Sequence, residues 1–320
     1  MNTKVKKILN ILGNIITLVA VFFVFRKLFT SSLDYTILFK QQNIFTITGI
    51  TLILTIIIIT NCYPWKKLVE IFSAKKMPWR DTIMVYTKSN LLKYLPGNVF
   101  QYVGRNELAT KREIPHLKVA TATVFDIFIN VLAAVVLSSI YFFQHGFSFH
   151  FNSQTILFIC IGFIALILGA AVVVYAFREK AHTFFKTIKQ FITLQTLKGF
   201  VSALIYYIFT MMIQSLLFTA LLVYVLDVSL NPQLFLQLFS AYTFSWLVGF
   251  ITPGAPAGIG IREAVMAGAT GGLINEGVIT FAMVIFRVLT TVADGLAFLL
   301  VLIFNMLKKD GQHKESSIEK

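Results

Sequence analysis

Charged residues are scarce in this chain of 320 residues, because Asp, Glu, Lys and Arg together make up only 13% of it. A soluble domain usually carries about 25% charged residues. This scarcity excludes an ordinary soluble enzyme and a disordered chain. Hydrophobic residues account for 57% of the sequence, and the mean hydropathy is +0.78. The composition is typical of a membrane protein with several transmembrane helices.

Cysteine and histidine are also rare, and so are acidic residues. The two cysteines, Cys62 and Cys160, each lie in or at the end of an apolar run, so they indicate neither a disulfide framework nor a metal site. The five histidines have no metal-binding spacing, and the sequence contains no catalytic motif such as GxSxG. We therefore predict no catalytic residues, no metal and no cofactor.

The basic residues outnumber the acidic ones, 28 to 14, which gives a formal net charge of +14. They lie mainly in the connections between apolar stretches. Such charges indicate contact with anionic phospholipid head groups rather than with nucleic acid.

A transmembrane helix needs about 20 predominantly apolar residues. Six stretches of the sequence are long and apolar enough: 8–25, 44–63, 117–143, 154–176, 200–226 and 278–307. We expect one all-α transmembrane domain over residues 1–307, followed by a cytoplasmic tail, 308–320, without regular structure. The first stretch lacks a signal-peptide cleavage site, so we interpret it as a retained span.

The distribution of Lys and Arg predicts the orientation in the cell membrane. With the N-terminus inside, the cytoplasmic segments 1–7, 64–116, 177–199 and 308–320 carry 22 basic residues, and the outer segments carry 4. Positive charge is enriched on the cytoplasmic side of membrane proteins. Both termini are therefore predicted to be cytoplasmic.

Two basic stretches, 65–76 and 182–198, combine Phe, Trp and Leu with Lys at helical spacing. This pattern is typical of helices that lie in the plane of the lipid head groups. A solvated connecting segment is an equally good interpretation.

Two segments, 91–111 and 246–268, interrupt the pattern of spans. Each contains a Pro-Gly pair followed by an arginine nine positions after the proline: Pro96, Gly97 and Arg105 in one, Pro253, Gly254 and Arg262 in the other. Proline breaks a helix and glycine permits a tight reversal. Broken helices are tolerated at membrane depth only where they face protein or a water-filled cavity.

The order of elements is the same in the two halves of the chain, about 1–143 and 154–307: two spans, a Pro-Gly segment and a third span. Three spans per half would insert the halves in opposite orientations, which is the inverted repeat found in many transporters. We expect residues 91–107 and 246–263 to be re-entrant, entering from opposite sides and meeting near the centre. The alternative is a pair of surface turns.

Ionisable residues within membrane segments usually mark function. The candidates are Asp126, Arg287 and Asp294 in the spans, with Arg105, Arg262 and Glu263 in the Pro-Gly segments. Arg287 and Asp294 are seven positions apart, so each needs a partner from another helix. These charges could include an Asp126–Arg287 pair. The alternative to a functional role is a set of structural ion pairs that orient the helices.

The arginines of the Pro-Gly segments are candidate ligands for phosphate, since a guanidinium group offers a bidentate fork. We expect Arg262 and Arg287 to bind a lipid phosphate, with Arg105 as the inner counterpart and nearby acidic residues holding the arginines when no lipid is bound. Gly258 and Gly260 would let the backbone approach a head group, or would only relieve packing at a bend.

The segments YLPGNVFQYVGR (94–105), FDIFINVL (125–132) and PGAPAGIGIREA (253–264) resemble motifs of the lysylphosphatidylglycerol synthase transmembrane family, also called flippase-like. The resemblance covers about residues 5–307. It implies an integral membrane protein that moves or handles anionic or modified lipids, in some members beside a glycosyltransferase. The full synthase is expected to carry a soluble aminoacyl-transferase domain after the membrane part, and we expect no lysyl transfer by this chain alone.

Three functions fit these observations. The first is a translocase or lipid-handling transporter for an anionic, phosphate-bearing lipid or a lipid-linked glycan. The second is a transferase that acts on a lipid, either lysyltransferase-like or a lipid-linked glycosyltransferase. The third is a non-catalytic membrane partner of a separate glycosyltransferase or aminoacyl-transferase.

Overall fold

The computed structural model describes residues 35–94, 100–145, 193–252 and 258–318, and all regular structure in these ranges is helical. The two predicted spans 8–25 and 154–176 lie outside the described residues, as does most of the basic stretch 182–198. The elements are η1 (Tyr35–Phe39), α2 (Gln41–Thr60), α3 (Cys62–Ser73), α4 (Trp79–Asn90), η2 (Leu91–Tyr94), α5 (Phe100–Thr110), α6 (His116–His145), α9 (Leu194–Tyr224), α10 (Pro232–Ile251), α11 (Ile261–Ala269) and α12 (Glu276–Ile318).

Five helical segments of the described chain are long and apolar enough to cross a membrane: Gln41–Ser73, His116–Tyr141, Leu194–Tyr224, Pro232–Ile251 and Glu276–Leu307. Four of them match predicted spans. The fifth, α10, is not among the six predicted stretches, and its end overlaps the segment 246–263 that we expected to be re-entrant. At 1.5 Å per residue, its 20 residues extend about 30 Å, the thickness of a hydrocarbon core.

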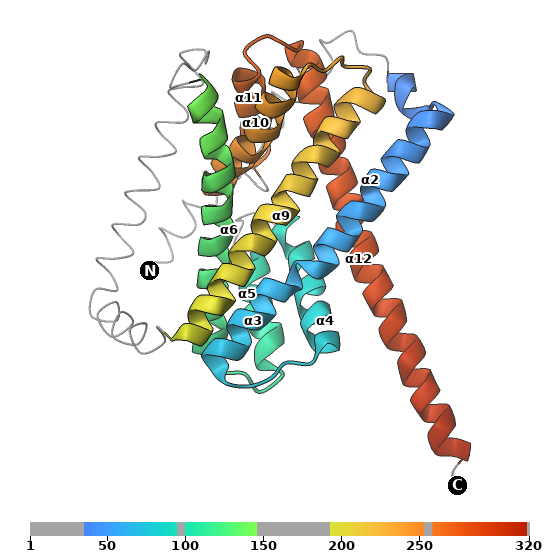
Figure 1. Cartoon of the computed structure of the whole chain (residues 1–320). Helices are drawn as coiled ribbons and strands as arrows, with labels where there is room; N and C mark the ends of the chain where they lie inside the picture. Colours follow the sequence, from blue (N-terminus) through green and yellow to red (C-terminus); the bar gives the residue numbers. More distant parts are fainter. Residues whose placement is uncertain (1–34, 95–99, 146–192, 253–257, 319–320) are drawn as a thin grey trace, which may run out of the picture.

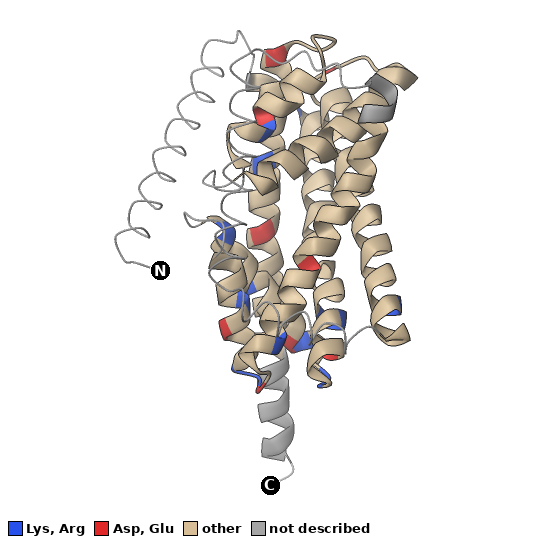
Figure 2. Cartoon of the chain, turned by 90° about the vertical axis from the view of Figure 1, so that its left-hand side faces the viewer, with Lys and Arg blue, Asp and Glu red and all other residues tan. Residues whose placement is uncertain are grey.

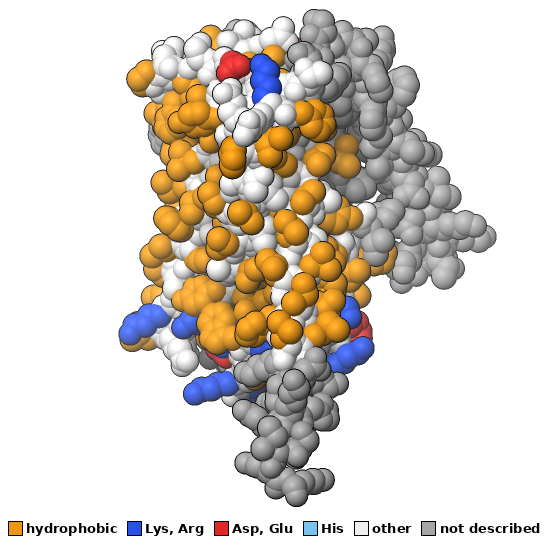
Figure 3. All heavy atoms as spheres, turned by 90° about the vertical axis from the view of Figure 1, so that its right-hand side faces the viewer, with side chains coloured by type: hydrophobic (Ala, Val, Ile, Leu, Met, Phe, Trp, Pro, Cys, Tyr) orange, Lys and Arg blue, Asp and Glu red, His pale blue; other side chains and the backbone are white. Residues whose placement is uncertain are grey.

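The surface supports a membrane environment. Large apolar side chains are exposed along α2, α9 and α12, including Ile56, Phe209 and Leu299. Figure 3 shows one face on which hydrophobic side chains cover the middle and most of the visible Lys and Arg side chains lie near the lower edge. The fold is therefore a polytopic membrane bundle.

Helix α3 differs from the prediction for residues 65–76. It begins directly after Asn61, and Figure 1 shows that it continues the line of α2. Trp65, Leu68 and Val69 are fully buried against neighbouring helices. The periodicity of this stretch therefore reflects packing inside the bundle, which neither interpretation, a helix in the head-group plane or a solvated connecting segment, had anticipated.

The predicted cytoplasmic segment 64–116 also contains two short helices, α4 and α5. They have 12 and 11 residues, too few for either to cross a membrane. They pack against each other and against α12 and α6 at the lower end of the bundle, whereas α10 and α11 lie at the upper end (Figure 1). Helix α12 continues through most of the tail 308–320, for which no regular structure was expected.

Local sequence explains where these helices start and stop. Asn231 accepts a hydrogen bond from the backbone N–H of Leu234 at 2.7 Å, and Pro232 follows it at the first helical position of α10. Thr193 caps α9 in the same way. Within the apolar helices, hydroxyl groups bond to backbone carbonyls one turn earlier, as Thr55 does to Thr51 at 2.8 Å.

The described residues form two apolar cores. The upper core joins α2, the second half of α9, α10, α11 and α12, with Leu54, Phe218 and Met266 at its centre. The lower core joins α3, α4, α6 and the first half of α9, with Trp65, Val119 and Ile129 at its centre. Helices α9 and α10 contribute to both cores.

Candidate functional site

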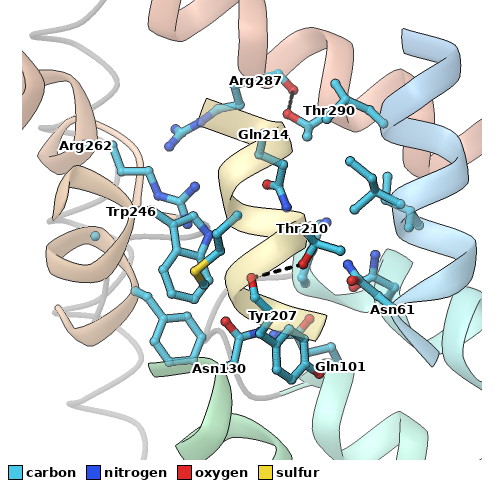
Figure 4. Close-up of a pocket in the computed structure, with 18 of the residues that line it drawn as sticks. Asn61, Gln101, Asn130, Tyr207, Thr210, Gln214, Trp246, Arg262, Arg287 and Thr290 are labelled. Carbon is cyan, nitrogen blue, oxygen red and sulfur yellow. Dashed lines mark hydrogen bonds between the residues drawn. The ribbon is translucent and has the colours of Figure 1, made fainter. Parts of the chain in front are cut away.

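A cavity of about 230 Å³ is lined by residues from both the upper and the lower core. Its walls come from α2, α4, η2, α5, α6, α9, α10, α11 and α12. Both Pro-Gly segments therefore contribute to one cavity, through Tyr94 and Arg105 on one side and Trp246 and Arg262 on the other. Figure 4 shows the labelled polar side chains directed into it from several helices.

Arg105 of α5 is 2% exposed and enclosed on all sides. Its Nη1 atom lies 3.3 Å from Oδ2 of Asp126 on α6, and Tyr207 of α9 donates a hydrogen bond to the other carboxylate oxygen. The guanidinium carbon lies 4.0 Å from the ring centre of Tyr86 and 5.6 Å from that of Trp65. Arg105 is thus neutralised by a buried carboxylate and covered by aromatic rings.

Asp294 of α12 is 1% exposed and binds the end of the α4–η2 segment. It accepts a hydrogen bond from the side-chain amide of Asn90 at 2.6 Å and another from Tyr94, and it forms an ion pair with Lys93. The carboxylate fixes the segment before Pro96 to the middle of the last span.

Glu263 of α11 is 3% exposed and pairs with Arg287 of α12, with 3.4 Å between Oε1 and Nη1. Its second oxygen accepts a hydrogen bond from the backbone N–H of Gly260 at 2.7 Å, which caps the start of α11. One carboxylate therefore both holds the bend that follows Pro253 and neutralises Arg287.

Arg262 lies next to this pair but has a different environment. Among the residues that the structure describes, its side chain forms no ion pair and no hydrogen bond, although its Nε atom is buried. Its guanidinium carbon lies 5.7 Å from the ring centre of Trp246. Burial, and then the positive charge of Arg287, lower the pKa of Arg262 below that of an ordinary arginine.

Two glycines provide the space that Arg262 occupies. A Cβ atom on Gly249 would lie 2.5 Å from Cγ of Arg262, and one on Gly258 would lie 2.9 Å from the carbonyl oxygen of Gly249. Gly258 and Gly260 also have φ angles of +76° and +83°. These contacts favour the packing interpretation of the Gly-Ile-Gly sequence: it permits the bend that directs Arg262 inwards.

The charges at the cavity can be counted from these contacts. Lys93, Arg105 and Arg287 are paired with Asp294, Asp126 and Glu263, respectively. Within the described chain, Arg262 is then the cation at the cavity without a carboxylate partner. A partly buried cation of this kind is stabilised by an anion, and a guanidinium group matches a phosphate well.

Of the six ionisable residues that the sequence singled out, four line the cavity: Arg105, Asp126, Arg262 and Arg287. Glu263 and Asp294 each pair with a residue that lines it, but the pairs are not always the expected ones. The Asp126–Arg287 pair was wrong, because Asp126 pairs with Arg105 and Arg287 pairs with Glu263. Asp294 holds a lysine rather than an arginine. Pro96, Gly97, Pro253 and Gly254 lie outside the described residues.

Several cavity residues were missed by the sequence analysis, namely Lys93, Tyr94, Tyr207, Gln214 and Trp246. Lys93 was counted only as one of many cytoplasmic charges, although its position three residues before Pro96 could have suggested a role. Tyr207 and Gln214 share one face of α9, seven residues apart, and are polar residues in an uncharged span. The described residues contain no cluster of three potential metal ligands.

Apolar helices around a cavity of paired charges define a polytopic membrane protein with a central polar site. The chain belongs to the family described as the lysylphosphatidylglycerol synthase TM region, whose family model matches residues 10–297. The family membership predicted from the three motifs is thereby confirmed. A search of the curated proteins found no match, and neither did a search of the solved structures.

Proposed function

We propose that this protein translocates, or holds for transfer, a lipid whose head group carries a phosphate. The main support is the charge at the cavity, where three cations are paired and Arg262 has no carboxylate partner in the described chain. A phosphate at Arg262 would neutralise a partly buried positive charge between the two cores. The cavity, about 230 Å³, is smaller than the usual pocket for a drug-sized ligand, which suits a head group whose acyl chains stay in the bilayer.

The arrangement of the short helices supports alternating access to this site. The segment α4–α5 lies at one end of the bundle and α10–α11 at the other, and both line the cavity (Figure 1). We infer that the two segments are related by an inverted repeat, as in transporters whose substrate binds where broken helices meet.

The proposed orientation places the lower end of the bundle in the cytoplasm. In Figure 2 most Lys and Arg positions lie towards the end from which α12 projects, as the positive-inside rule requires of a cytoplasmic end. In a cysteine-free background, a cysteine at Ser317 or Lys111 should react with an impermeant reagent only after cell lysis. A cysteine at Leu273, at the other end, should react in intact cells. Labelling of Ser317 from outside would refute this orientation.

Lipid translocation can be measured with purified protein in liposomes that contain acyl-labelled phosphatidylglycerol. Dithionite quenches only the label in the outer leaflet, so translocation increases the fraction that is quenched. We expect quenching above 50% with the wild-type protein and close to the protein-free level with Arg262→Gln. The matched control is Arg80→Gln, which replaces an exposed arginine bonded to Asn305, about three helical turns after Asp294 on α12.

The same assay separates the alternatives. Wild-type liposomes that match protein-free ones would refute translocation. If the protein still bound the lipid under those conditions, a holding role beside a separate transferase would be supported instead.

A further inference from the structure

The cavity has a second set of polar groups besides its charges. Asn61 follows α2, Asn130 is on α6 and Gln214 is on α9, and Figure 4 shows their amide groups facing the cavity. Among the described residues, none of the three side chains forms a hydrogen bond, and the amide oxygens of Asn61 and Asn130 are buried. Buried amides are usually hydrogen-bonded, so these groups have room for a partner that both donates and accepts.

The charges nearby restrict what this partner can be. The carboxylates around the cavity, Asp126, Glu263 and Asp294, each already pair with a cation. A head group with an ammonium group would bring a second positive charge beside Arg262 and Arg287 without a free carboxylate to neutralise it. An uncharged hydroxyl group can donate to an amide oxygen and accept from an amide N–H at no such electrostatic cost.

We propose that the cavity selects a phosphate-linked head group that is uncharged and carries hydroxyl groups, with the phosphate at Arg262 and the hydroxyls at Asn61, Asn130 and Gln214. This inference rests on the proposed function and specifies its substrate class. A glycerol head group and a sugar-like head group share this chemistry. An ethanolamine or lysyl ester head group does not.

Binding is tested with short-chain phosphatidylglycerol, phosphatidylinositol, phosphatidylethanolamine and phosphatidic acid, added to the purified full-length protein in detergent. Affinity is measured by titration, and folding is checked by thermal unfolding. We expect the two hydroxylated lipids to bind at least tenfold more tightly than phosphatidylethanolamine. The ratio between phosphatidylinositol and phosphatidylglycerol distinguishes a sugar-like head group from glycerol.

Variants assign the two parts of the head group. Asn130→Leu and Gln214→Leu should weaken phosphatidylglycerol binding several-fold and leave phosphatidic acid binding unchanged, because phosphatidic acid has no hydroxylated head group. Arg262→Gln should weaken both. The matched control is Gln195→Leu, an exposed glutamine on the same helix as Gln214.

A variant that changes the lipid preference distinguishes head-group recognition from a purely structural effect. Asn130→Asp places a new carboxylate in the cavity and should shift the preference towards phosphatidylethanolamine. Equal affinity of the wild type for the ethanolamine and glycerol lipids, or unchanged binding in the amide variants, would overturn the inference. If Arg262→Gln still abolished translocation in that case, the proposed function would stand and only the head-group class would be wrong.

Discussion

The arginines of the two Pro-Gly segments occupy equivalent places in the sequence but different environments in the fold. Arg105 is 2% exposed, paired with Asp126 and packed against aromatic rings. Arg262 faces the cavity, and within the described residues no carboxylate pairs with it. The exposed Glu107 follows the first arginine, whereas the buried Glu263 follows the second and serves Arg287 instead. The comparison indicates that one arginine holds the fold together and the other is available to a ligand.

The largest effect is expected from breaking the Arg105–Asp126 pair. Arg105→Met leaves the carboxylate of Asp126 buried without its cation, which should cost about 3–5 kcal/mol of stability. Thermal unfolding of the purified protein should show a large drop. The double variant Arg105→Met with Asp126→Asn should recover most of the loss, because no buried charge remains. No recovery would mean that Arg105 acts through something other than this pair.

Arg262→Lys should have the opposite profile, with weaker lipid binding and an intact fold. The lysine keeps the charge but loses the bidentate fork. The loss of one charge-assisted contact corresponds to about 1.5–3 kcal/mol, or roughly tenfold to hundredfold in lipid affinity. Lipid titration and thermal unfolding measure the two effects separately. A destabilisation as large as that of Arg105→Met would remove the contrast between the two arginines.

Arg287 should be intermediate, because its side chain is 20% exposed and its partner Glu263 only 4%. Arg287→Ala should cost about 1–3 kcal/mol of stability by leaving Glu263 unpaired. Adding Glu263→Gln should restore stability but not translocation, if Arg287 also contributes to phosphate binding. Full translocation by the double variant would show that Arg287 is only a packing charge.

The smallest effects are expected from two glycines, one beside each arginine. A Cβ on Gly249 would clash with Cγ of Arg262, whereas a Cβ on Gly104 would meet only the flexible end of Leu92, at 2.2 Å. Gly249→Ala should therefore shift Arg262 and reduce lipid affinity several-fold. Gly104→Ala should leave lipid affinity unchanged. Lipid titration of both variants compares the two segments directly. Equal lipid affinities of the two variants would mean that binding does not depend on the position of the Arg262 side chain.

The spans and the candidate ionisable residues were accessible to sequence analysis, because long apolar runs and charges within them have few alternative explanations. Helix α3 was misassigned because a buried amphipathic helix and a membrane-surface helix have the same periodicity. The segment α10 was not counted as a span because it leads into Pro253. The pairing of charges could not be predicted, since Asp126 and Arg287 lie on spans whose relative rotation is set by tertiary packing.

Asn61 has a further consequence, because it separates α2 from α3 and thereby the upper core from the lower core. A bundle with one continuous core must break apolar contacts to open an internal site, whereas here each core can keep its own packing. Helix α9, by contrast, is unbroken from Leu194 to Tyr224 and packs in both cores, so movement of one core against the other would have to bend it as well. The cavity is therefore lined by Asn61, where α2 and α3 can change their angle, and by α9, which is continuous past it, and this limits how far the two cores can tilt.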